Sequence, residues 1–399
     1  MPTVLQPLSQ SNRDTSLDML RGFALAGVLL TFCAGDVGSP AAYTNSFWDE
    51  AVKWTKWILI ENRMYTMLII IFGIGFHVQL EKAKQKGTSL VPVFTRRLAG
   101  LLVIGFVHAI LLSTRDILMF YGIAGIVLLY VKNATNRQLF LFMAILFFIV
   151  TPLVARFQEG FRAFDLAQPN NFSDHVQHNW QFFKLYHQIY PIYCEMVIHF
   201  MLGFIIGRLG ILQAIKTNKK LRSRLLIASV LGSAILIPLC YFWFPKAFPA
   251  FASHLHHSWE KFLAAIFART LWLLWMFVSV TLYATTLLGL WNSTNGKKWL
   301  SPLAPFGQMA LSNYLIQSIV LVPYLLAFDK YNNIPPFSGF ILFLIVLALQ
   351  LFFSSWWMRR YTMGPFEWLL RSFTYWKWQT INKSAPVIND YQPIFLIKN

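Results

Sequence analysis

Long apolar runs separated by short polar stretches dominate the hydropathy pattern of this chain. A helix needs about 17 to 25 such residues to cross roughly 30 Å of hydrocarbon. The pattern therefore predicts an all-α integral membrane protein, a polytopic bundle of about ten transmembrane helices. We expect these helices near residues 17–34, 64–80, 98–114, 116–132, 139–156, 191–213, 224–244, 262–290, 301–327 and 336–358.

The polar segments divide the chain around this bundle. Residues 17–358 form the predicted transmembrane part, between an N-terminal tail, 1–16, and an amphipathic C-terminal tail, 359–399. Residues 50–62 alternate apolar and cationic positions at helical spacing, which is typical of an interfacial helix rather than a span. The long loop 157–190 combines acidic, amide and aromatic side chains and is a candidate outer cap.

Positive charge is distributed unevenly between the predicted loops. Loop 81–97 holds five Lys and Arg residues, whereas the longer loop 157–190 holds two. Lys and Arg accumulate on the cytoplasmic side of membrane proteins. We therefore predict that both termini are cytoplasmic.

Composition supports a membrane environment. Hydrophobic residues make up 56% of the chain and charged residues 13%, against roughly 25% charged in soluble domains. The net charge of +18 suits cytoplasmic loops that contact anionic lipid headgroups. No soluble segment carries a basic stripe with interleaved aromatic residues, so lipids and not nucleic acid are the predicted partners. The three cysteines have neither disulfide nor metal-ligand spacing, and we predict no metal site.

Polar side chains inside apolar runs are the candidates for function, because their burial costs free energy unless something uses them. Asp18 and Arg21 share one helix face, as an interfacial ion pair or as an anion clamp for an acyl-CoA phosphate or a substrate carboxylate. His108 is either a general base or a helix–helix hydrogen bond. Asp116 is either the N-cap of the next helix or a partner of His108 across the hairpin.

Four further candidates lie along the chain. Glu195 and His199, four residues apart, form either a proton or ion pathway or a solvated group at the outer interface. Arg63 and Arg97, just before two predicted spans, are either interfacial anchors or anion-binding groups.

A pair of amides lies in the ninth predicted span. Asn313 and Gln317 are four residues apart and lie next to Ser312 and Ser318. Inside a bilayer such amides either bridge neighbouring helices or orient a polar substrate.

Four segments, taken in order and spacing, carry a family resemblance. The second spans Phe94 to Leu129, and the four together read "LDMLRGFALAGVLL", "FTRRLAGLLVIGFVHAILLSTRDILMFYGIAGIVLL", "APFGQMALSNYLIQS" and "GPFEWLLRSFTY". They resemble the YeiB family, whose shared region is called domain of unknown function 418, with residues 259–375 as its C-terminal signature region. The last segment also pairs Glu367 with Arg371 at helical spacing, which is typical of an interfacial helix that closes the bundle.

The resemblance implies a fold grouped with transmembrane acyltransferases and a place in a bacterial plasma or inner membrane. In the type 3 enzymes of that group, the first helix carries an arginine and, eleven positions later, a histidine needed for acyl transfer. Counted from Arg21, that position is Phe32 here. A phenylalanine cannot accept a proton, so an acyltransferase of this sequence needs its base elsewhere.

Three functions follow as hypotheses. The first is transfer of an acyl group from a cytoplasmic acyl-CoA, past Asp18, Arg21 and Arg97, with His108 as base. The second is a transporter of a small anionic or amphipathic molecule, with Glu195, His199 and the Arg21 region as intramembrane charges. The third is a non-catalytic membrane sensor or scaffold, and the sequence leaves both a monomer and a homodimer open.

Overall fold

The computed structural model describes residues 14–34, 46–113, 116–150, 171–186, 190–240, 258–327 and 334–383. In these residues the regular elements are helices, and the β-structure consists of one isolated bridge between Tyr361 and Asn382. The all-α prediction is therefore confirmed for the described residues. The α-helices are α1 (Thr15–Cys33), α2 (Phe47–Thr55), α3 (Arg63–Gln85), α4 (Val91–Leu111), α5 (Leu118–Val131), α6 (Asn136–Ile145), α8 (Phe172–Tyr186), α9 (Tyr190–Arg208), α10 (Ile211–Thr217), α11 (Lys219–Pro238), α13 (Ser258–Trp291), α14 (Thr294–Leu300), α15 (Leu303–Gln308), α16 (Ala310–Ala327), α17 (Pro336–Arg360) and α18 (Pro365–Tyr375). Two π-helical turns, η2 (Lys56–Ile60) and η3 (Leu146–Val150), continue α2 and α6.

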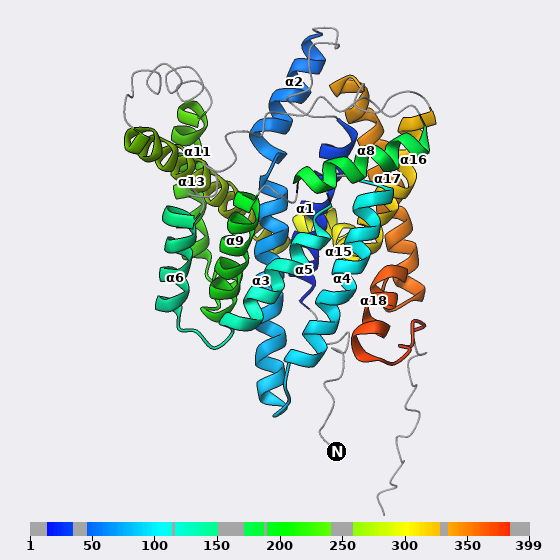
Figure 1. The fold of residues 1–399 in the computed structure, drawn as a ribbon, viewed down its shortest axis with the longest axis horizontal. Coiled ribbons are helices and arrows are strands. Elements are labelled where there is room, and N and C mark those ends of the chain that lie inside the picture. Colours follow the sequence, from blue (N-terminus) through cyan, green and yellow to red (C-terminus); the bar gives the residue numbers. More distant parts are fainter. Residues whose placement is uncertain are drawn as a thin grey trace, which may run out of the picture.

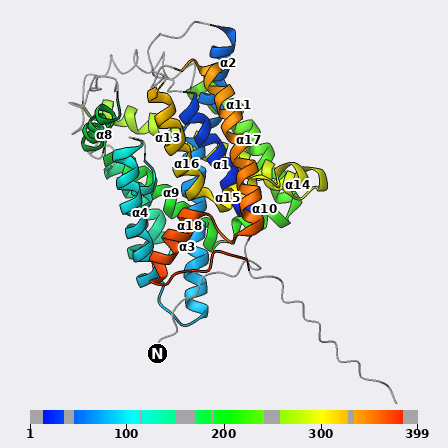
Figure 2. The ribbon, with the colours of Figure 1, turned by 90° about the vertical axis from the view of Figure 1, so that its right-hand side faces the viewer.

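The helices surround a centre formed by α1, α3 and α15 (Figure 1). The α4–α5 hairpin, α17 and α18 lie on one flank, and α6, α9, α11 and α13 on the other. Helix α8 lies near one end of the bundle and α18 near the other, and we name these ends the α8 end and the α18 end. Figure 2 shows α8 above α4 and α18 between the lower parts of α4 and α17.

Glycines set the closest helix crossings. A Cβ atom on Gly307 of α15 would lie 1.9 Å from the Asp18 carbonyl oxygen of α1, and one on Gly203 of α9 would lie 2.2 Å from the Ile70 carbonyl oxygen of α3. Only glycine lets the two backbones touch, as is usual where small residues pack membrane helices. Gly73 packs in the same way, with a Cβ position 2.3 Å from the Phe200 carbonyl oxygen.

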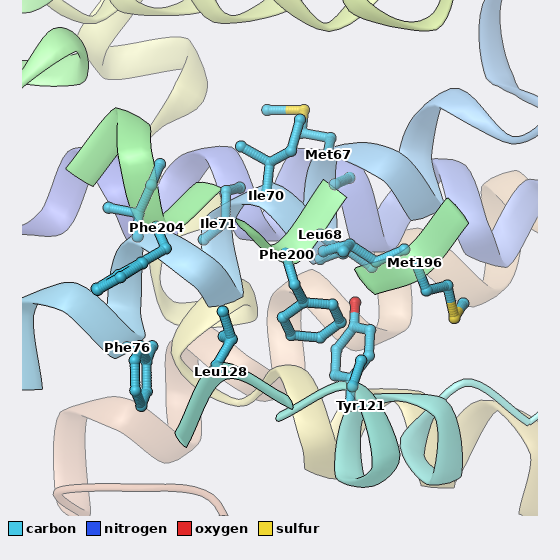
Figure 3. Close-up of a cluster of buried hydrophobic side chains, with 14 of the residues drawn as sticks. Met67, Leu68, Ile70, Ile71, Phe76, Tyr121, Leu128, Met196, Phe200 and Phe204 are labelled. Atoms are coloured by element: carbon cyan, nitrogen blue, oxygen red, sulfur yellow. The ribbon is translucent and has the colours of Figure 1, made fainter. Parts of the chain in front are cut away.

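An aromatic layer fills the space between α3, α5 and α9. Phe200 packs edge-on against Phe72, with ring centroids 5.0 Å apart, and against Tyr121 at 5.3 Å. Figure 3 shows Phe200 and Tyr121 facing each other below Leu68 and Met196. This packing fixes the position of α5, and with it the α4–α5 hairpin that carries His108.

Among the described residues, six helical segments are long and apolar enough to cross a membrane, and a bent pair, 193–208 with 211–217, makes up to seven. The six are Thr15–Cys33, Phe47–Gln85, Val91–Leu111, Lys219–Pro238, Ile266–Trp291 and Pro336–Arg360. The criteria of length and apolarity therefore do not confirm the predicted count of about ten transmembrane helices. Two apolar helices, 118–131 and 136–150, are shorter, and the predicted span 301–327 is interrupted at Met309 between α15 and α16.

The predicted interfacial helix 50–62 instead runs into α3, so that Phe47–Gln85 forms one candidate span of 39 residues. Asn62 interrupts it with a φ of 62°. The buried guanidinium of Arg63 donates from Nη1 to the carbonyl oxygens of Trp57 and Glu61, both at 2.7 Å. Arg63 thus satisfies the carbonyls freed at the break, and it is neither an interfacial anchor nor placed in an open anion site.

Parts of the predicted tails and loops lie outside the described residues. These parts are 1–13 and 384–399 of the tails, and 157–170 and 187–189 of the candidate outer cap. Within the described part of that loop, α8 covers the end of α4. The Asn179 amide donates to the Ile110 carbonyl oxygen at 3.1 Å, and His175 Nε2 lies 3.1 Å from the Leu112 carbonyl oxygen. Burial lowers the pKa of His175.

Candidate functional site

His108 and Asp116 meet across the α4–α5 hairpin. His108 Nδ1 lies 2.9 Å from Asp116 Oδ1, and both side chains are buried. The contact is an electrostatic pair rather than a linear hydrogen bond, because neither atom has a partner with good hydrogen-bond geometry in the described residues. Asp116 Oδ2 also accepts from the Met119 N–H at 2.8 Å. Asp116 therefore faces His108, and although Ile117 and not Asp116 is the N-cap residue of α5, the Asp116 carboxylate accepts from the first turn of that helix.

Gly105 is the residue that lets the hairpin close. It lies one turn before His108, on the same face of α4. A Cβ on Gly105 would lie 2.7 Å from Asp116 Oδ2 and 2.6 Å from the Met119 nitrogen. Any larger residue would push the carboxylate away from the imidazole.

The other nitrogen of the imidazole faces a serine from a distant part of the chain. His108 Nε2 lies 2.8 Å from Ser318 Oγ on α16, and the Tyr314 ring packs on the imidazole with a centroid distance of 4.9 Å. Because an ionised carboxylate only accepts protons, the pair with Asp116 favours the tautomer with the proton on Nδ1. The lone pair of Nε2 then faces the Ser318 hydroxyl.

Phe32 lies close to this group. Its ring packs against Tyr314 at 6.1 Å, and Tyr314 in turn packs against His108. The Phe32 ring is thus separated from the His108 imidazole by one aromatic ring.

The amides of α16 point to a different neighbour. Asn313 Nδ2 donates to Ser354 Oγ at 2.9 Å, Gln317 Nε2 donates to Gln350 Oε1 at 3.0 Å, and Gln350 Nε2 donates back to the Asn313 carbonyl oxygen at 3.1 Å. All four side chains are buried. Their hydrogen bonds bridge α16 to α17, as the helix-bridging interpretation predicts. Tyr314 and Ser318, each one position later, face α4 instead.

Asp18 and Arg21 form an ion pair near the start of α1, with Nη1 2.7 Å from Oδ1. The Asp18 side chain is buried, whereas 29% of the Arg21 side chain is exposed. At 1.5 Å per residue, Arg21 lies about 16 Å along α1 from Phe32. We call His108, Asp116, Ser318 and Tyr314 the His108 group. The Asp18–Arg21 ion pair and the His108 group therefore occupy two levels of the same bundle. Arg97, on α4, places its guanidinium over the Phe72 ring at 5.4 Å.

The Glu195 and His199 side chains do not pair with each other. The Glu195 carboxylate lies 2.6 Å from Arg269 Nη2 of α13, and His199 Nδ1 donates to the Glu195 carbonyl oxygen at 2.7 Å. The buried Nε2 of His199 has no hydrogen-bond partner in the described part of the chain. A direct carboxylate–imidazole relay is thus not formed here. Nor do the described residues group three or more His, Cys, Asp or Glu side chains suited to a metal ion.

Helix α18 contacts both α4, which carries His108, and α16, which carries Ser318, and so fixes their relative position. Glu367 Oε1 accepts from the Leu311 and Ser312 N–H groups at 2.7 and 3.1 Å, and so caps the start of α16. A Cβ on Gly100 of α4 would lie 2.6 Å from Leu370 of α18. Burial raises the pKa of Glu367. The sequence predicted a pair between Glu367 and its helix neighbour, but this carboxylate binds α16.

The sequence analysis named Ser318 and Glu367 but did not predict their contacts in this arrangement. Ser318 appeared only as a neighbour of Gln317, and nothing in the spacing of α16 says which face meets α4. The signal that could have identified it is the repeat of polar residues at 313, 314, 317 and 318. Two adjacent pairs at four-residue spacing mark two polar faces of one helix.

These observations define a class of protein: its described residues form helices, several of them long and apolar enough to cross a membrane, around buried Asp, His and Ser side chains in contact with one another. Residues 206–377 match the family model described as "Protein of unknown function (DUF418)". Over this segment, which is less than half of the chain, the protein is similar to that family. Ser318 lies inside the matched segment, and His108 and Asp116 lie before it.

Three bacterial relatives match nearly the whole chain. YxaH of Bacillus subtilis is 29% identical over 96% of this chain and 99% of its own, and it is described as uncharacterised. YeiB of Escherichia coli, also described as uncharacterised, is 22% identical over 94% of this chain and 98% of its own. A 39.9 kDa protein of Bacillus acidopullulyticus is 24% identical over 96% and 98%. No solved structure matches the chain significantly.

Proposed function

We propose that this protein transfers an acyl group from a thioester donor to an acceptor hydroxyl, with His108 as the general base. The observation that carries the proposal is the buried pair of His108 Nδ1 and Asp116 Oδ1 at 2.9 Å, with Nε2 facing a hydroxyl. A carboxylate behind an imidazole fixes the tautomer and stabilises the imidazolium that forms when Nε2 takes a proton.

The place of His108 supports this role. The acyltransferases that the sequence resembles use a histidine of the first helix, and Phe32 occupies that position here. Since the Phe32 and His108 rings both pack against Tyr314, a base on α4 serves nearly the same part of the bundle. His108 would thus replace the missing first-helix histidine.

Arg21 supports acyl-CoA as the donor. Its guanidinium, partly exposed beside Asp18, suits the phosphates of CoA. The thioester sulfur lies at the end of a long flexible arm, which suits a phosphate site at Arg21 and a base at the level of Phe32, about 16 Å further along α1. Arg97 is the second cation proposed to attract the donor.

The surroundings are proposed to be the lipid of a bacterial plasma or inner membrane, with both termini on the cytoplasmic side. Large apolar side chains such as Phe352, Ile235 and Val103 face outward from the described helices, and lipid would cover them. The uneven distribution of Lys and Arg between loops supports the orientation.

The test is thiol release from acetyl-CoA and palmitoyl-CoA by the full chain, purified in detergent, with and without a simple alcohol as acceptor. We expect release by the wild type and its loss in His108→Ala, because no other proposed group takes the proton. Arg21→Ala should raise KM for the donor more than it lowers kcat. Absence of release with both donors would contradict the proposal.

Transport is a second candidate, and interrupted helices favour it. The Phe47–Gln85 segment breaks at Asn62, α15 and α16 separate at Met309, and α9 meets α10 at a 57° bend near Gly210. Secondary transporters bind substrates at such breaks. Flux of organic anions into proteoliposomes, lost in Glu195→Gln, would favour this function over acyl transfer.

A further inference from the structure

We propose that Ser318 is a covalent nucleophile, which carries the acyl group as an ester between donor and acceptor. The proposal rests on the proposed acyl transfer for its donor, a fatty acyl thioester, and adds a second catalytic residue and a second chemical step. The Asp116, His108 and Ser318 side chains form a chain with contacts of 2.9 and 2.8 Å. A nucleophile and its base work at about 2.6–3.2 Å, with a third group orienting the base.

Ser318 differs from other hydroxyl residues in the helices of this protein. The hydroxyls of Thr31, Ser279 and Thr285 each donate to the carbonyl oxygen four residues earlier in their own helix. This is the common way to satisfy such a group in an apolar helix. The Ser318 hydroxyl instead contacts an imidazole 210 residues away in the chain. The contact aligns a hydroxyl proton with the one basic atom of the pair.

The first step consumes the thioester. Ser318 Oγ attacks the carbonyl carbon while His108 Nε2 removes the hydroxyl proton, and the tetrahedral intermediate then collapses. The C–S bond breaks with its electron pair on sulfur, and the imidazolium gives its proton to that sulfur. The products are a free thiol and an ester on Ser318.

The second step regenerates the enzyme. An acceptor hydroxyl gives its proton to His108 Nε2 and attacks the ester carbonyl carbon. The bond to Ser318 Oγ breaks, and this oxygen takes back the proton from the imidazolium. No oxidant, reductant or metal is needed, and the net reaction is one acyl group exchanged for one proton.

The surroundings of Ser318 favour a fatty acyl group. Ile319 and Val320, directly after it, and Val107, directly before His108, are exposed on the outside of the bundle. A single helix layer therefore separates the hydroxyl from the surface that lipid would cover. An alkyl chain lying in that apolar layer brings its thioester carbonyl to the level of Ser318.

The experiment uses the full chain in detergent, treated with palmitoyl-CoA or acetyl-CoA and measured by intact-protein mass spectrometry. We expect the mass of one palmitoyl group on the wild type and on Ser279→Ala, the control with a buried helical serine. Ser318→Ala should show no adduct and release thiol at least about 100-fold more slowly. Ser318→Cys should form a thioester, which neutral hydroxylamine cleaves far faster than the wild-type ester.

A fluorophosphonate probe separates the two proposals, because it reacts with activated serines whatever the natural donor. Labelling of Ser318 that His108→Ala abolishes supports the nucleophile even if neither CoA thioester is turned over, in which case the donor proposal fails. Thiol release by Ser318→Ala at the wild-type rate, lost in His108→Ala, overturns the nucleophile and leaves direct transfer. Absence of both labelling and adduct in the wild type overturns the nucleophile as well.

Discussion

Two buried histidines of this bundle, His108 and His199, have opposite surroundings. Both lie in apolar helices and both were candidates from the sequence. His108 has a carboxylate at one nitrogen and a serine hydroxyl at the other. Among the described residues, His199 has the Glu195 carbonyl oxygen as its hydrogen-bond partner at Nδ1 and none at Nε2, and the Glu195 carboxylate pairs with Arg269. Burial alone therefore does not equip a histidine for proton transfer.

The physical difference lies in what happens when a proton arrives. A carboxylate beside the ring stabilises an imidazolium through charge, whereas a neutral carbonyl stabilises it only weakly. In an apolar interior the uncompensated charge is costly. In the proposed mechanism the pair of His108 and Asp116 accepts a proton and returns it, whereas the surroundings of His199 suit a neutral, structural role.

The largest predicted effect contrasts the two histidines directly. His108→Ala should lower the rate of thiol release by about 1,000-fold, as expected for loss of a general base. His199→Ala should change it by less than about 10-fold, through packing alone. Initial rates of the two purified variants test this, and equal losses would end the distinction.

The next effect concerns the carboxylate. Asp116→Asn keeps the size of the side chain and an oxygen that can cap α5, but removes the charge that faces His108. We expect thiol release to fall by about 100-fold, with the melting temperature nearly unchanged. A large loss of thermal stability with little loss of rate would make Asp116 a cap and nothing more.

A third prediction concerns the glycine that makes room for the carboxylate. Gly105→Ala places a methyl group against Asp116 and should destabilise the protein by about 1–3 kcal/mol. The control is Gly75→Ala, in a helix of the same bundle, where a Cβ meets nothing within 4 Å. That change should be neutral or stabilise by up to about 1 kcal/mol. Thermal unfolding in detergent compares the two, and equal shifts would contradict the close approach.

The smallest predicted effect is a dependence on pH at the α18 end. Burial raises the folded-state pKa of Glu367. The folded protein therefore binds the proton of this carboxyl more tightly than the unfolded protein does. This contribution is fully present below the unfolded value of about 4.3 and is lost as pH rises through the folded pKa. The melting temperature of the wild type should therefore fall more between pH 4 and 7 than that of Glu367→Gln. Identical pH profiles would contradict the shift.

The sequence predicted much of this fold because its signals are local. Apolar runs indicated the positions of α1, α4 and α17. The interruption at Met309 was missed, because apolar residues continue through it. The burial of Arg63 could not be predicted from the sequence, because it depends on Trp275, which is more than 200 positions away. The Trp275 ring centroid lies 3.7 Å from the Arg63 guanidinium.

The candidate site was predictable only in part. His108 stood out because an imidazole inside an apolar run is costly, and Asp116 followed from its place at the hairpin. Their contact depends on Gly105, whose role is visible only when both helices are in place. Ser318 depends on the rotation of α16, which Glu367 and the amides facing α17 set through contacts distant in sequence.

The most direct test of the central claim, that Asp116 acts through His108, is a double-mutant cycle of His108→Ala and Asp116→Asn. The measured quantity is the rate of thiol release from palmitoyl-CoA by the four proteins. If the two residues act as one unit, the loss caused by Asp116→Asn disappears in the His108→Ala background. If Asp116→Asn costs the same factor in both backgrounds, the carboxylate acts independently of the imidazole and the account is wrong.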